Sequence, residues 1–305
     1  MFTLPDVGDI VTLALAEDLG VAPERIAPGA LASHELLERD VTTSSVVGPD
    51  ALFGGHIVAR EGCVVCGLPV VGAVYERLSA AAGLFEPVEV FPLVAEGARV
   101  DAGTPLVEIG GVALAVLAGE RTVLDFTMML SGIATETARW VDAAGPTLAV
   151  CDTRKTPPGL RELAKYAVAV GGGTNHRHGL FDMVLVKDNH IARAGGIAAA
   201  VASARAAHPE LRIEVEADTI EQAVAAARGG ADIVLLDNMD DAALAEAVLA
   251  VEAVAAETGT AVLTEASGGI TFDRLAALAA TGVDRISSSA LTFGARPIDL
   301  GLDES

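Results

Sequence analysis

The sequence predicts an α/β protein in which an α+β domain precedes a domain of parallel strands and helices. The chain has 305 residues, enough for one large or two ordinary domains. About half of the residues are hydrophobic (51%) but only 4% are aromatic, so the core must consist mainly of Ala, Val, Leu and Ile, as in buried parallel strands. From residue 147 onward, short apolar segments alternate with alanine-rich helical segments, which is the pattern of βαβ units.

Three helices and one insertion are expected before this alternation begins. Residues 9–20 have the apolar spacing of a helix and end in a glycine that suits a C-cap. Residues 70–82 also have helical spacing, whereas residues 21–39, with two prolines, are predicted to be a surface insertion. Residues 113–144 predict a long, mostly apolar helix that carries Arg121. Such a helix lies either in the core or in a subunit interface, and its length favours the interface.

Short strands separated by glycines are expected between Leu52 and Gly111. Within them, residues 96–106 (EGARVDAGTPL) predict a tight hairpin. Cys63 and Cys66 form a C-x-x-C motif, which can be a redox pair or half of a zinc site. No second Cys or His pair has metal-site spacing, so both cysteines are predicted to be small buried residues of an apolar strand.

The second half of the chain predicts about six parallel strands separated by helices. The strands are expected at Leu148–Cys151, Met183–Val186, Ile213–Val215, Ile233–Leu236, Ala261–Leu263 and Arg285–Ser287. The helices are expected at residues 160–170, 196–207, 219–228, 240–257 and 271–281. Such strands can form an open doubly wound sheet or a curved, incomplete barrel. The predicted domains are residues 1–124 and 125–294, with residues 295–305 packing on the first.

Polar side chains follow each predicted strand where it ends. These strand ends are Asp152–Lys155, Lys187–His190, Glu216, Asp237 with Asn238, Glu265 with Ser267–Gly269, and Ser288 with Ser289. Because the carboxyl ends of parallel strands meet at one edge of a sheet, they predict an α/β-barrel active site. Asp237 alone could be a helix N-cap, but that explanation does not extend to all six strand ends.

Positive charge is concentrated in one short segment of an acidic chain. The formal net charge is −22, yet all three lysines, Lys155, Lys165 and Lys187, lie between residues 150 and 192. A cationic cluster in an acidic protein predicts a polyanionic ligand, whereas the acidic total argues against nucleic acid or an anionic membrane as a partner. No apolar run reaches transmembrane length and the first residues lack signal-peptide features, so a cytoplasmic location is expected.

Charge also indicates what the strand ends bind. Ser267–Gly269, followed by a predicted helix, would present backbone N–H groups to a phosphate. Glu216 and Asp237, on neighbouring strands, suit Mg²⁺ or the hydroxyls of a ribose. The cations exceed what one monophosphate needs, so we expect two polyanions, one with phosphates and another with carboxylates. These cations are Arg154, Lys155, His176, Arg177 and Lys187.

One long motif resembles a known enzyme family. Residues 153–191 (TRKTPPGLRELAKYAVAVGGGTNHRHGLFDMVLVKDNHI) closely resemble the signature of quinolinate phosphoribosyltransferase, also called nicotinate-nucleotide pyrophosphorylase (carboxylating). The segments LAEDLG, DVTT, AGERTVLDFTMMLSGIAT, IEVEAD, IVLLDNM, EASGGI and GVDRIS resemble further family motifs in the family's order, so the resemblance covers nearly the whole chain. It implies a two-domain subunit with an incomplete α/β barrel, and a homodimer, with a higher oligomer left open.

The resemblance also implies the reaction. The phosphoribosyl group of 5-phosphoribosyl-1-pyrophosphate would be transferred to quinolinate with Mg²⁺, giving nicotinate mononucleotide, pyrophosphate and CO₂ in NAD biosynthesis. Lys155 would face the pyrophosphate, and Glu216 and Asp237 would serve the metal, directly or indirectly, and the ribose, which makes these three the expected catalytic residues.

The same resemblance assigns the substrate contacts. Arg121 would reach the quinolinate site of the neighbouring subunit. The other residues expected to bind quinolinate are Arg154, His176, Arg177 and Lys187. The 5-phosphate would be bound by Ser267, Gly268 and Gly269, and further substrate contacts are expected from Thr153, Ser288 and Ser289.

Four positions depart from the family pattern, of which Asp125 and Met128 are the milder departures. Ser289 stands where the family usually has a glycine and Phe293 where it usually has a histidine, both near the expected 5-phosphate site. Asp125 replaces the usual asparagine. These departures leave open a specialised paralogue acting on another pyridine carboxylate, and a non-catalytic phosphometabolite-binding protein. A relative associated with molybdenum transport is a further alternative, against which the intact Lys187–His190 run argues.

Overall fold

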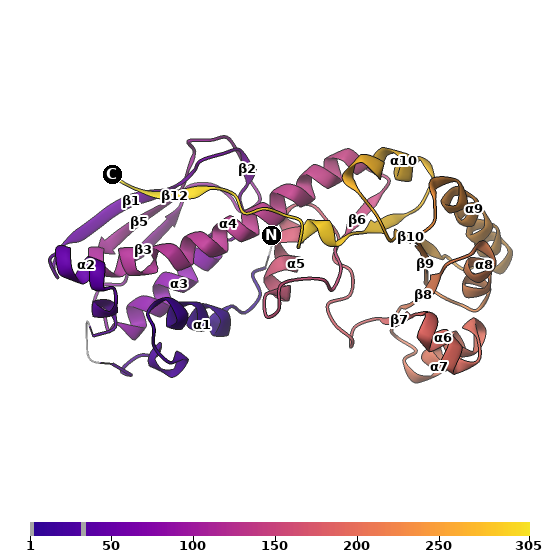
Figure 1. Ribbon diagram of the computed structural model, residues 1–305, viewed down its shortest axis with the longest axis horizontal. Coiled ribbons are helices and arrows are strands. Elements are labelled where there is room, and N and C mark those ends of the chain that lie inside the picture. Colours follow the sequence, from indigo (N-terminus) through magenta and orange to yellow (C-terminus); the bar gives the residue numbers. More distant parts are fainter. Residues whose placement is uncertain (1–2, 32–34) are drawn as a thin grey trace. The chain divides into compact units, whose positions relative to one another are not determined.

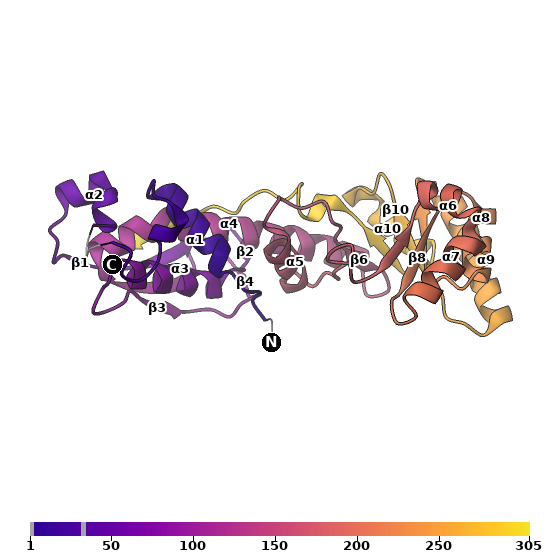
Figure 2. The ribbon, with the colours of Figure 1, turned by 90° about the horizontal axis from the view of Figure 1, so that it is seen from below.

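The computed structural model describes residues 3–31 and 35–305. The chain divides into two compact units (Figures 1 and 2). The first unit comprises Met1–Glu136, Pro157–Gly171 and Ala295–Ser305, and the second comprises Thr137–Thr156 and Gly172–Gly294. Their first boundary falls within the long helix α4 (Ala113–Ala144), as does the boundary expected between residues 124 and 125. The predicted helix over residues 113–144 is confirmed.

An antiparallel sheet forms the centre of the first unit. Its strands are arranged in the order β12 (Leu300–Glu304), β1 (Leu52–Ala59), β5 (Pro105–Val112) and β3 (Glu89–Pro92). The last strand of the chain therefore pairs with the first, with Ile57 opposite Leu302. On β1 the buried residues alternate with partly exposed ones, as expected for a sheet with one face on the core. The expected helices over residues 9–20 and 70–82 are α1 (Gly8–Asp18) and α3 (Leu68–Ala81).

The prediction of a hairpin over residues 96–106 is wrong. Strand β4 (Arg99–Val100) pairs with β2 (Cys63–Val64) and not with the strand that follows it. The tight turn is present, with Gly103 at φ +86°, but β5 continues into the main sheet, where its apolar side chains are buried. Local turn chemistry predicted the turn and not the strand partner, because pairing depends on where the apolar face is buried.

A short helix begins at residue 41. Asp40 accepts hydrogen bonds from the backbone N–H groups of Thr42 and Thr43, and so caps helix α2 (Val41–Val46). The expected insertion contains two short 3₁₀ helices, η1 (Pro23–Arg25) and η2 (Leu37–Arg39). Residues 32–34 of that insertion lie outside the described residues.

Cys63 and Cys66 are buried and not disulfide-bonded, as expected for small core residues. Burial raises the pKa of the Cys63 thiol to about 11 and that of Cys66 well above its usual range. Neither cysteine belongs to the His and carboxylate cluster that could hold a metal among the described residues. They are therefore structural residues, although the strand itself is only Cys63–Val64.

A parallel sheet forms the second unit. Its strands lie in the order β6 (Ala149–Cys151), β11 (Arg285–Ser287), β10 (Leu263–Ser267), β9 (Ile233–Asp237), β8 (Ile213–Ala217) and β7 (Val184–Val186). All neighbouring pairs are parallel. The consecutive strands β6 and β7 are at opposite edges and do not pair within the described chain, so the barrel stays open. The predicted fold class, an incomplete α/β barrel after an α+β domain, is confirmed.

Helices cover the outer face of this sheet. Helices α7 (Ile197–Ala207), α8 (Ile220–Arg228) and α9 (Asp241–Thr258) pack against β8, β9 and β10, as Figure 1 shows. Short α6 (Asp188–Ala194), which was not predicted, begins directly after β7. The helix expected over residues 160–170 is α5 (Arg161–Val170), which belongs to the first unit. None of the described helices is long and apolar enough to cross a membrane.

The fifth predicted strand was placed too early. Strand β10 spans Leu263–Ser267 and not Ala261–Leu263, so Glu265 and Ser267 lie within the strand. The helix expected over residues 271–281 is shorter and divided, with the 3₁₀ helix η3 (Phe272–Arg274) before α10 (Leu275–Ala280). The strand was predicted too early because the prediction followed the apolar residues alone, and these do not include Glu265, which is polar but buried.

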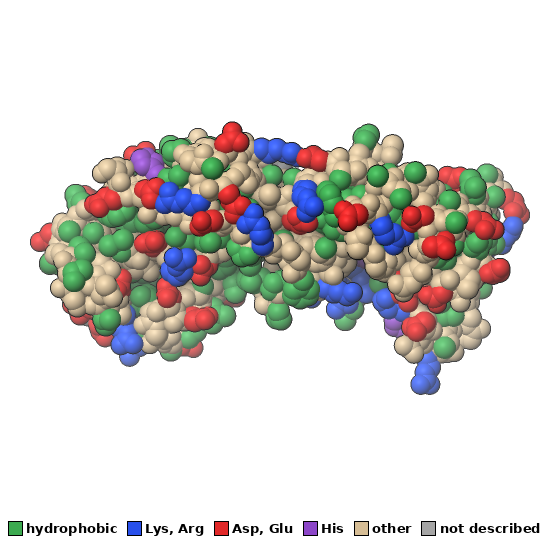
Figure 3. All heavy atoms as spheres, turned by 45° about the horizontal axis from the view of Figure 1, so that its top comes forward, with side chains coloured by type: hydrophobic (Ala, Val, Ile, Leu, Met, Phe, Trp, Pro, Cys, Tyr) green, Lys and Arg blue, Asp and Glu red, His purple; other side chains and the backbone are tan. Residues whose placement is uncertain are grey.

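Acidic side chains are spread over the visible face in Figure 3, with fewer basic ones among them. This agrees with the formal charge of −22. All three lysines of the chain lie within residues 153–191, and the placement of the cations in this segment indicates where an anion can bind.

Candidate active site

A cavity of about 380 Å³ lies at the carboxyl ends of the parallel strands. It brings together residues that are far apart in the sequence and that come from five of the strand ends or the loops beside them. Its lining consists of Thr153, Arg154, Lys155, His176, Arg177, Leu185, Lys187, Leu235, Glu265, Ser267 and Ser287. Eight of these residues were named from the sequence at the predicted strand ends or in the expected site, so the predicted convergence of the strand ends is present.

The loop after β6 holds two of the cations. The backbone N–H of Lys155 donates to Thr153 Oγ1 over 3.0 Å, and its carbonyl accepts from Thr292 Oγ1 over 2.7 Å. Both contacts restrain the backbone while the Lys155 side chain stays exposed. An exposed ammonium on a restrained backbone is suited to an anionic ligand in the cavity.

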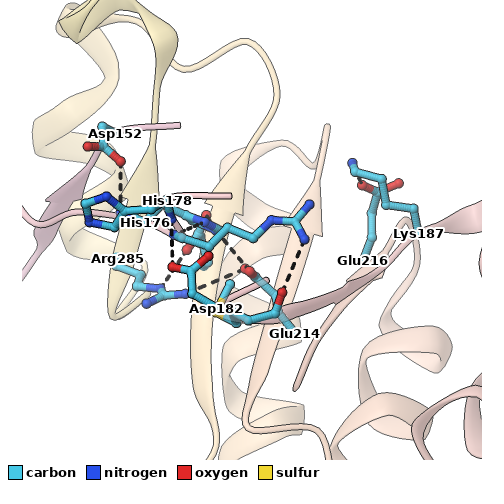
Figure 4. A network of polar contacts seen from close by, with 11 residues as sticks. Asp152, His176, His178, Asp182, Lys187, Glu214, Glu216 and Arg285 are labelled. Carbon is cyan, nitrogen blue, oxygen red and sulfur yellow. Dashed lines mark hydrogen bonds and ion pairs between the residues drawn. The ribbon is translucent and has the colours of Figure 1, made fainter. Parts of the chain in front are cut away.

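Lys187 follows β7 and forms an ion pair with Glu216 at the carboxyl end of β8 (Figure 4). The Lys187 backbone N–H donates to His190 Nδ1 over 2.9 Å, which anchors the start of α6. The sequence assigned Lys187 to a carboxylate ligand and Glu216 to a metal or ribose. In this structure the two side chains pair with each other, so either ligand would have to replace that contact.

Glu216 and Asp237 end the neighbouring strands β8 and β9. The pKa of Asp237 is raised, first by its partial burial and then by the negative charge of Glu216, while Lys187 acts in the opposite direction. Two adjacent carboxylates have the oxygen donors that Mg²⁺ prefers, and a cation would relieve the repulsion between their charges. The donor set thus fits the expected metal.

His176 uses both ring nitrogens within the protein. Its Nδ1 accepts a hydrogen bond from the backbone N–H of Arg177 over 2.8 Å, and its Nε2 lies 2.9 Å from Glu214 Oε2. The His176 backbone N–H donates to buried Asp152 over 2.9 Å (Figure 4). Burial would lower the pKa of His176, but the contact with Glu214 and the charge of Glu265 outweigh it, so the pKa is raised. His176 therefore lines the cavity while its polar atoms point to protein partners.

Arg177 and Arg154 are the guanidinium groups of the cavity. Arg177 NH1 donates to the Met183 carbonyl over 3.3 Å, which holds the side chain along the loop before β7. Its pKa is lowered, mainly by burial and then by the charge of Arg154. The two cations therefore lie close enough to repel each other, and an anion with more than one carboxylate would reduce that repulsion.

Sequence reasoning missed Glu214 and Arg285. Glu214 on β8 and Glu265 on β10 are fully buried, and Arg285 on β11 lies with Nε 2.6 Å from Glu265 Oε2. The sequence does contain a signal for these residues: in IEVEA and RIS, polar side chains alternate with apolar ones within strands that were expected to be wholly apolar. Side chains two residues apart share a face, so these polar residues line the cavity side of the sheet while the residues between them pack against helices.

Ser267–Gly269 forms a loop that is not the start of an α-helix, contrary to expectation. Gly268 and Gly269 have φ of +79° and +61°, and the next helix is the 3₁₀ segment η3. A Cβ at Gly268 would lie 2.2 Å from Asn238 Oδ1, so this position needs glycine. A phosphate here would be bound by the loop's own N–H groups, without the dipole of an α-helix.

Ser288 and Ser289 begin the short 3₁₀ helix η4 (Ser289–Leu291) after β11. Ser288 Oγ accepts from the Ala290 N–H over 3.2 Å, and the Ser289 carbonyl accepts from the Phe293 N–H over 2.9 Å. The Phe293 side chain is 61% exposed. Ser288, Ser289, Gly268 and Gly269 are not among the residues that line the cavity, and their substrate contacts stay predictions.

Arg121 lies in the first unit, on α4, and lines a different cavity of about 450 Å³. The side chain is exposed and forms an ion pair over 3.2 Å with Asp125, one helical turn later. Glu17 and Asp18 line the same cavity. The expected role of Arg121 in the site of a neighbouring subunit stays a prediction.

Two family models match this chain. Residues 40–131 match the N-terminal domain and residues 133–303 match the C-terminal domain of quinolinate phosphoribosyl transferase. The chain belongs to the quinolinate phosphoribosyltransferase family. The resemblance stated from the sequence is thereby confirmed.

Named relatives cover most of the chain. It is 42% identical over 265 residues to a nicotinate-nucleotide pyrophosphorylase [carboxylating] of Mycobacterium leprae, spanning 87% of this chain and 90% of that protein. The Homo sapiens protein of that name is 38% identical over 248 residues, with 80% of each chain covered. The structure of nicotinate-nucleotide pyrophosphorylase from Ehrlichia chaffeensis superposes with a TM-score of 0.84 at 32% identity, covering 99% of this chain and 100% of the other. Membership in the family therefore applies to both units.

Proposed function

We propose that this protein catalyses the decarboxylating transfer of a phosphoribosyl group from 5-phosphoribosyl-1-pyrophosphate to quinolinate, a step of NAD biosynthesis. The products are nicotinate mononucleotide, pyrophosphate and CO₂. One observation carries the proposal: in a member of this family, the strand ends bring Arg154, Arg177 and Lys187 into one cavity with Lys155. Cations in this number suit a dicarboxylate and a pyrophosphate together.

Different residues of the cavity bind the two substrates. Arg154, Arg177 and Lys187 bind the two carboxylates of quinolinate, which orients the pyridine nitrogen toward C1 of the ribose. Lys155, whose backbone is restrained by Thr153 and Thr292, places its ammonium at the pyrophosphate. Holding both reactants in a near-attack geometry is a large part of such catalysis.

Glu216 and Asp237 are the residues that would hold Mg²⁺, directly or through water, and the ribose hydroxyls. Their placement on adjacent strands and the raised pKa of Asp237 support this proposal. When bound, Mg²⁺ would supply positive charge at the departing pyrophosphate. In the structure Lys187 pairs with Glu216, so this ammonium leaves Glu216 when it binds the substrate carboxylate.

The chemistry needs no covalent nucleophile on the protein. As the bond between C1 and pyrophosphate breaks, C1 becomes oxocarbenium-like, and Lys155 offsets the charge that develops on the leaving oxygen. The pyridine nitrogen forms the new bond to C1 and becomes cationic. The 2-carboxylate then leaves as CO₂, and its electron pair stays on C2 beside the cationic nitrogen until a proton binds there. Positioning and electrostatics account for the protein's contribution.

The assembly and location are further parts of the proposal. The exposed Arg121 on an apolar helix supports a homodimer in which each subunit supplies Arg121 to the other subunit's quinolinate site. The acidic total charge supports an enzyme without nucleic acid or anionic membrane partners, and a cytoplasmic location is part of the same proposal.

A product assay tests the proposal. Purified protein is incubated with quinolinate, 5-phosphoribosyl-1-pyrophosphate and Mg²⁺, and nicotinate mononucleotide is followed by chromatography. We expect stoichiometric product that depends on all three components. Nicotinate, which lacks the 2-carboxylate, replaces quinolinate in the control and should give little product. Turnover of nicotinate or another pyridine acid in preference to quinolinate would contradict the proposed acceptor.

A further inference from the structure

The buried cluster beneath the cavity has charges that do not balance without one further proton. Glu214 and Glu265 are both fully buried. Arg285 is their cation, with Nε 2.6 Å from Glu265 Oε2 and NH2 3.6 Å from Glu214 Oε1. The net charge of Glu214, Glu265 and Arg285 is one negative charge if the imidazole of the neighbouring His176 is neutral. A buried charge without a partner is strongly unfavourable.

The hydrogen bonds of His176 indicate where that proton is held. Against the effect of burial, Glu214 and Glu265 raise the pKa of His176, but His176 Nδ1 accepts the Arg177 N–H and so carries no proton, which leaves the ring in this geometry neutral with its proton on Nε2. Nε2 lies 2.9 Å from Glu214 Oε2 and 3.5 Å from Glu265 Oε1. The ring proton on Nε2 therefore lies nearest to Glu214, the closer of the two carboxylates. We therefore assign the additional proton to Glu265, the carboxylate that lies farther from Nε2.

We propose that Glu265 is a positioning residue of the quinolinate pocket, held as a neutral carboxylic acid so that the pocket floor carries no net negative charge beneath the bound dianion. The proposal rests on the proposed function, because quinolinate is its ligand. Glu265 belongs to the lining of the cavity that holds Arg154, Arg177 and Lys187. An ionised Glu265 would repel the carboxylates that these cations attract.

The surroundings of Glu265 support the neutral form. Burial and then the charge of Glu214 raise its pKa to about 7, while His176 and Arg285 act in the opposite direction. Glu216 is farther away, since Leu235 on β9 lies in register between it and Glu265. The titratable, charged and polar groups around the cluster, taken from every neighbouring element, are Glu214, Arg285, Ser287, Cys151, His176, Asp152, Arg154 and Arg177.

A proton neutralises the charge of this cluster better than a metal ion would. His176, Glu214 and Glu265 have the ligand types of a metal site and lie close enough together to form one. However, Arg285 already supplies a positive charge to both carboxylates. A divalent ion would leave an excess of positive charge in the same buried volume, whereas one proton makes the cluster neutral.

The sign of the pH dependence follows from the raised pKa. Glu265 is neutral below its pKa and ionised above it, so quinolinate binding weakens as the pH rises through the neutral range. The KM for quinolinate should rise by up to about tenfold per pH unit above that pKa, because one proton is required. Binding at about pH 8 should also take up a proton, since the dianion favours the protonated form of Glu265.

Calorimetry of quinolinate binding tests the proposal. Titrations at about pH 8 in two buffers of different ionisation enthalpy count the protons taken up. We expect uptake approaching one proton in the native protein and none from this group in Glu265→Gln, which mimics the neutral acid. The KM for quinolinate should then lose its rise with pH. Glu257→Gln, which removes an exposed carboxylate on α9, is the matched control and should keep the proton uptake of the native protein.

A measurement without ligand separates this proposal from the proposed function. The infrared spectrum of the native protein near neutral pH should contain the band of a buried protonated carboxyl, and Glu265→Gln should lack it. If that variant does not fold, carboxyl-labelled glutamate in the native protein should show one glutamate that titrates near neutral pH by NMR. Proton uptake that persists in Glu265→Gln, or the absence of such a carboxyl, would overturn the proposal. Failure to bind quinolinate with the carboxyl band present would contradict the proposed acceptor instead.

Discussion

Two cavities of this protein, the one lined by Arg154 and Arg177 and the one lined by Arg121, differ in how their charges are arranged. In the second unit, cations at the strand ends are held by backbone contacts and stand above a buried cluster of Glu214, Glu265 and Arg285. In the first unit, Arg121 is exposed on a helix and shares its cavity with Asp125 and other acidic residues. The first arrangement is preorganised for anions. The second is not an anion site by itself, because the carboxylates around Arg121 offset its charge.

The largest expected effect concerns Lys187 in the preorganised cavity. Lys187→Ala removes a charge that binds a substrate carboxylate, so kcat/KM should fall by about 10²- to 10³-fold, on the order of 3–4 kcal/mol for a charge-assisted contact used in the transition state. Steady-state kinetics with both substrates measure this loss. Arg228→Ala, which breaks an exposed ion pair with Glu257 on the outer helices, is the control and should retain native kinetics. Native turnover in Lys187→Ala would remove Lys187 from the site.

Arg121 gives the next test, because it is proposed to act in the quinolinate site of the neighbouring subunit. If each subunit supplies Arg121 to its partner, Arg121→Ala and Lys155→Ala proteins should both be inactive alone. Mixed and reassembled, they should form heterodimers with one intact site of two, which restores up to about half of the native activity per heterodimer. Heterodimers verified by mass spectrometry but without activity would mean that Arg121 does not act across the interface.

Much of the preorganised cavity could be predicted from the sequence, for a physical reason. Polar residues such as Lys187 and Glu216 follow apolar runs, and parallel topology brings the ends of those runs together. Glu214 and Arg285 were missed because they lie inside strands, where an apolar pattern was expected. The IEVEA alternation contains the signal, but its meaning depends on which face of the sheet forms the cavity.

Other errors have the same origin in long-range structure. The turn at Gly103 was predicted, yet its strands pair with different partners. The loop at Gly268 was predicted to begin a helix, whereas its conformation is set by close packing against Asn238. In both cases local chemistry specified the local conformation. The partner segment came from a distant part of the chain, which no local pattern reveals.

A smaller effect is expected at Ser289 and Phe293, which follow β11 and depart from the family pattern. The double change Ser289→Gly with Phe293→His removes a Cβ and adds a donor near the expected 5-phosphate site. We expect the KM for 5-phosphoribosyl-1-pyrophosphate to fall several-fold, by about 1 kcal/mol for one hydrogen bond, with little change for quinolinate. Separate KM measurements for the two substrates check this. A change in which pyridine acid is accepted would instead place both residues in the acceptor pocket.

The smallest expected effect concerns Asp125, which pairs with Arg121 over 3.2 Å. An exposed pair of this kind contributes only about 0.3–0.5 kcal/mol. Asp125→Asn should therefore free Arg121 for the substrate and lower the KM for quinolinate by about twofold, with native thermal stability. Initial rates over a range of quinolinate concentrations measure the change. A higher KM in this variant would show that Asp125 orients Arg121 and does not compete with the substrate.

The most direct test of the central claim is the release of CO₂ from quinolinate labelled in its 2-carboxylate. The cavity is proposed to bind both carboxylates and to lose one only after the bond to ribose has formed. Labelled CO₂ should therefore appear in a one-to-one ratio with nicotinate mononucleotide, and only when 5-phosphoribosyl-1-pyrophosphate and Mg²⁺ are both present. Nucleotide formation that retains the label, or label release without the phosphoribosyl donor, would contradict the account.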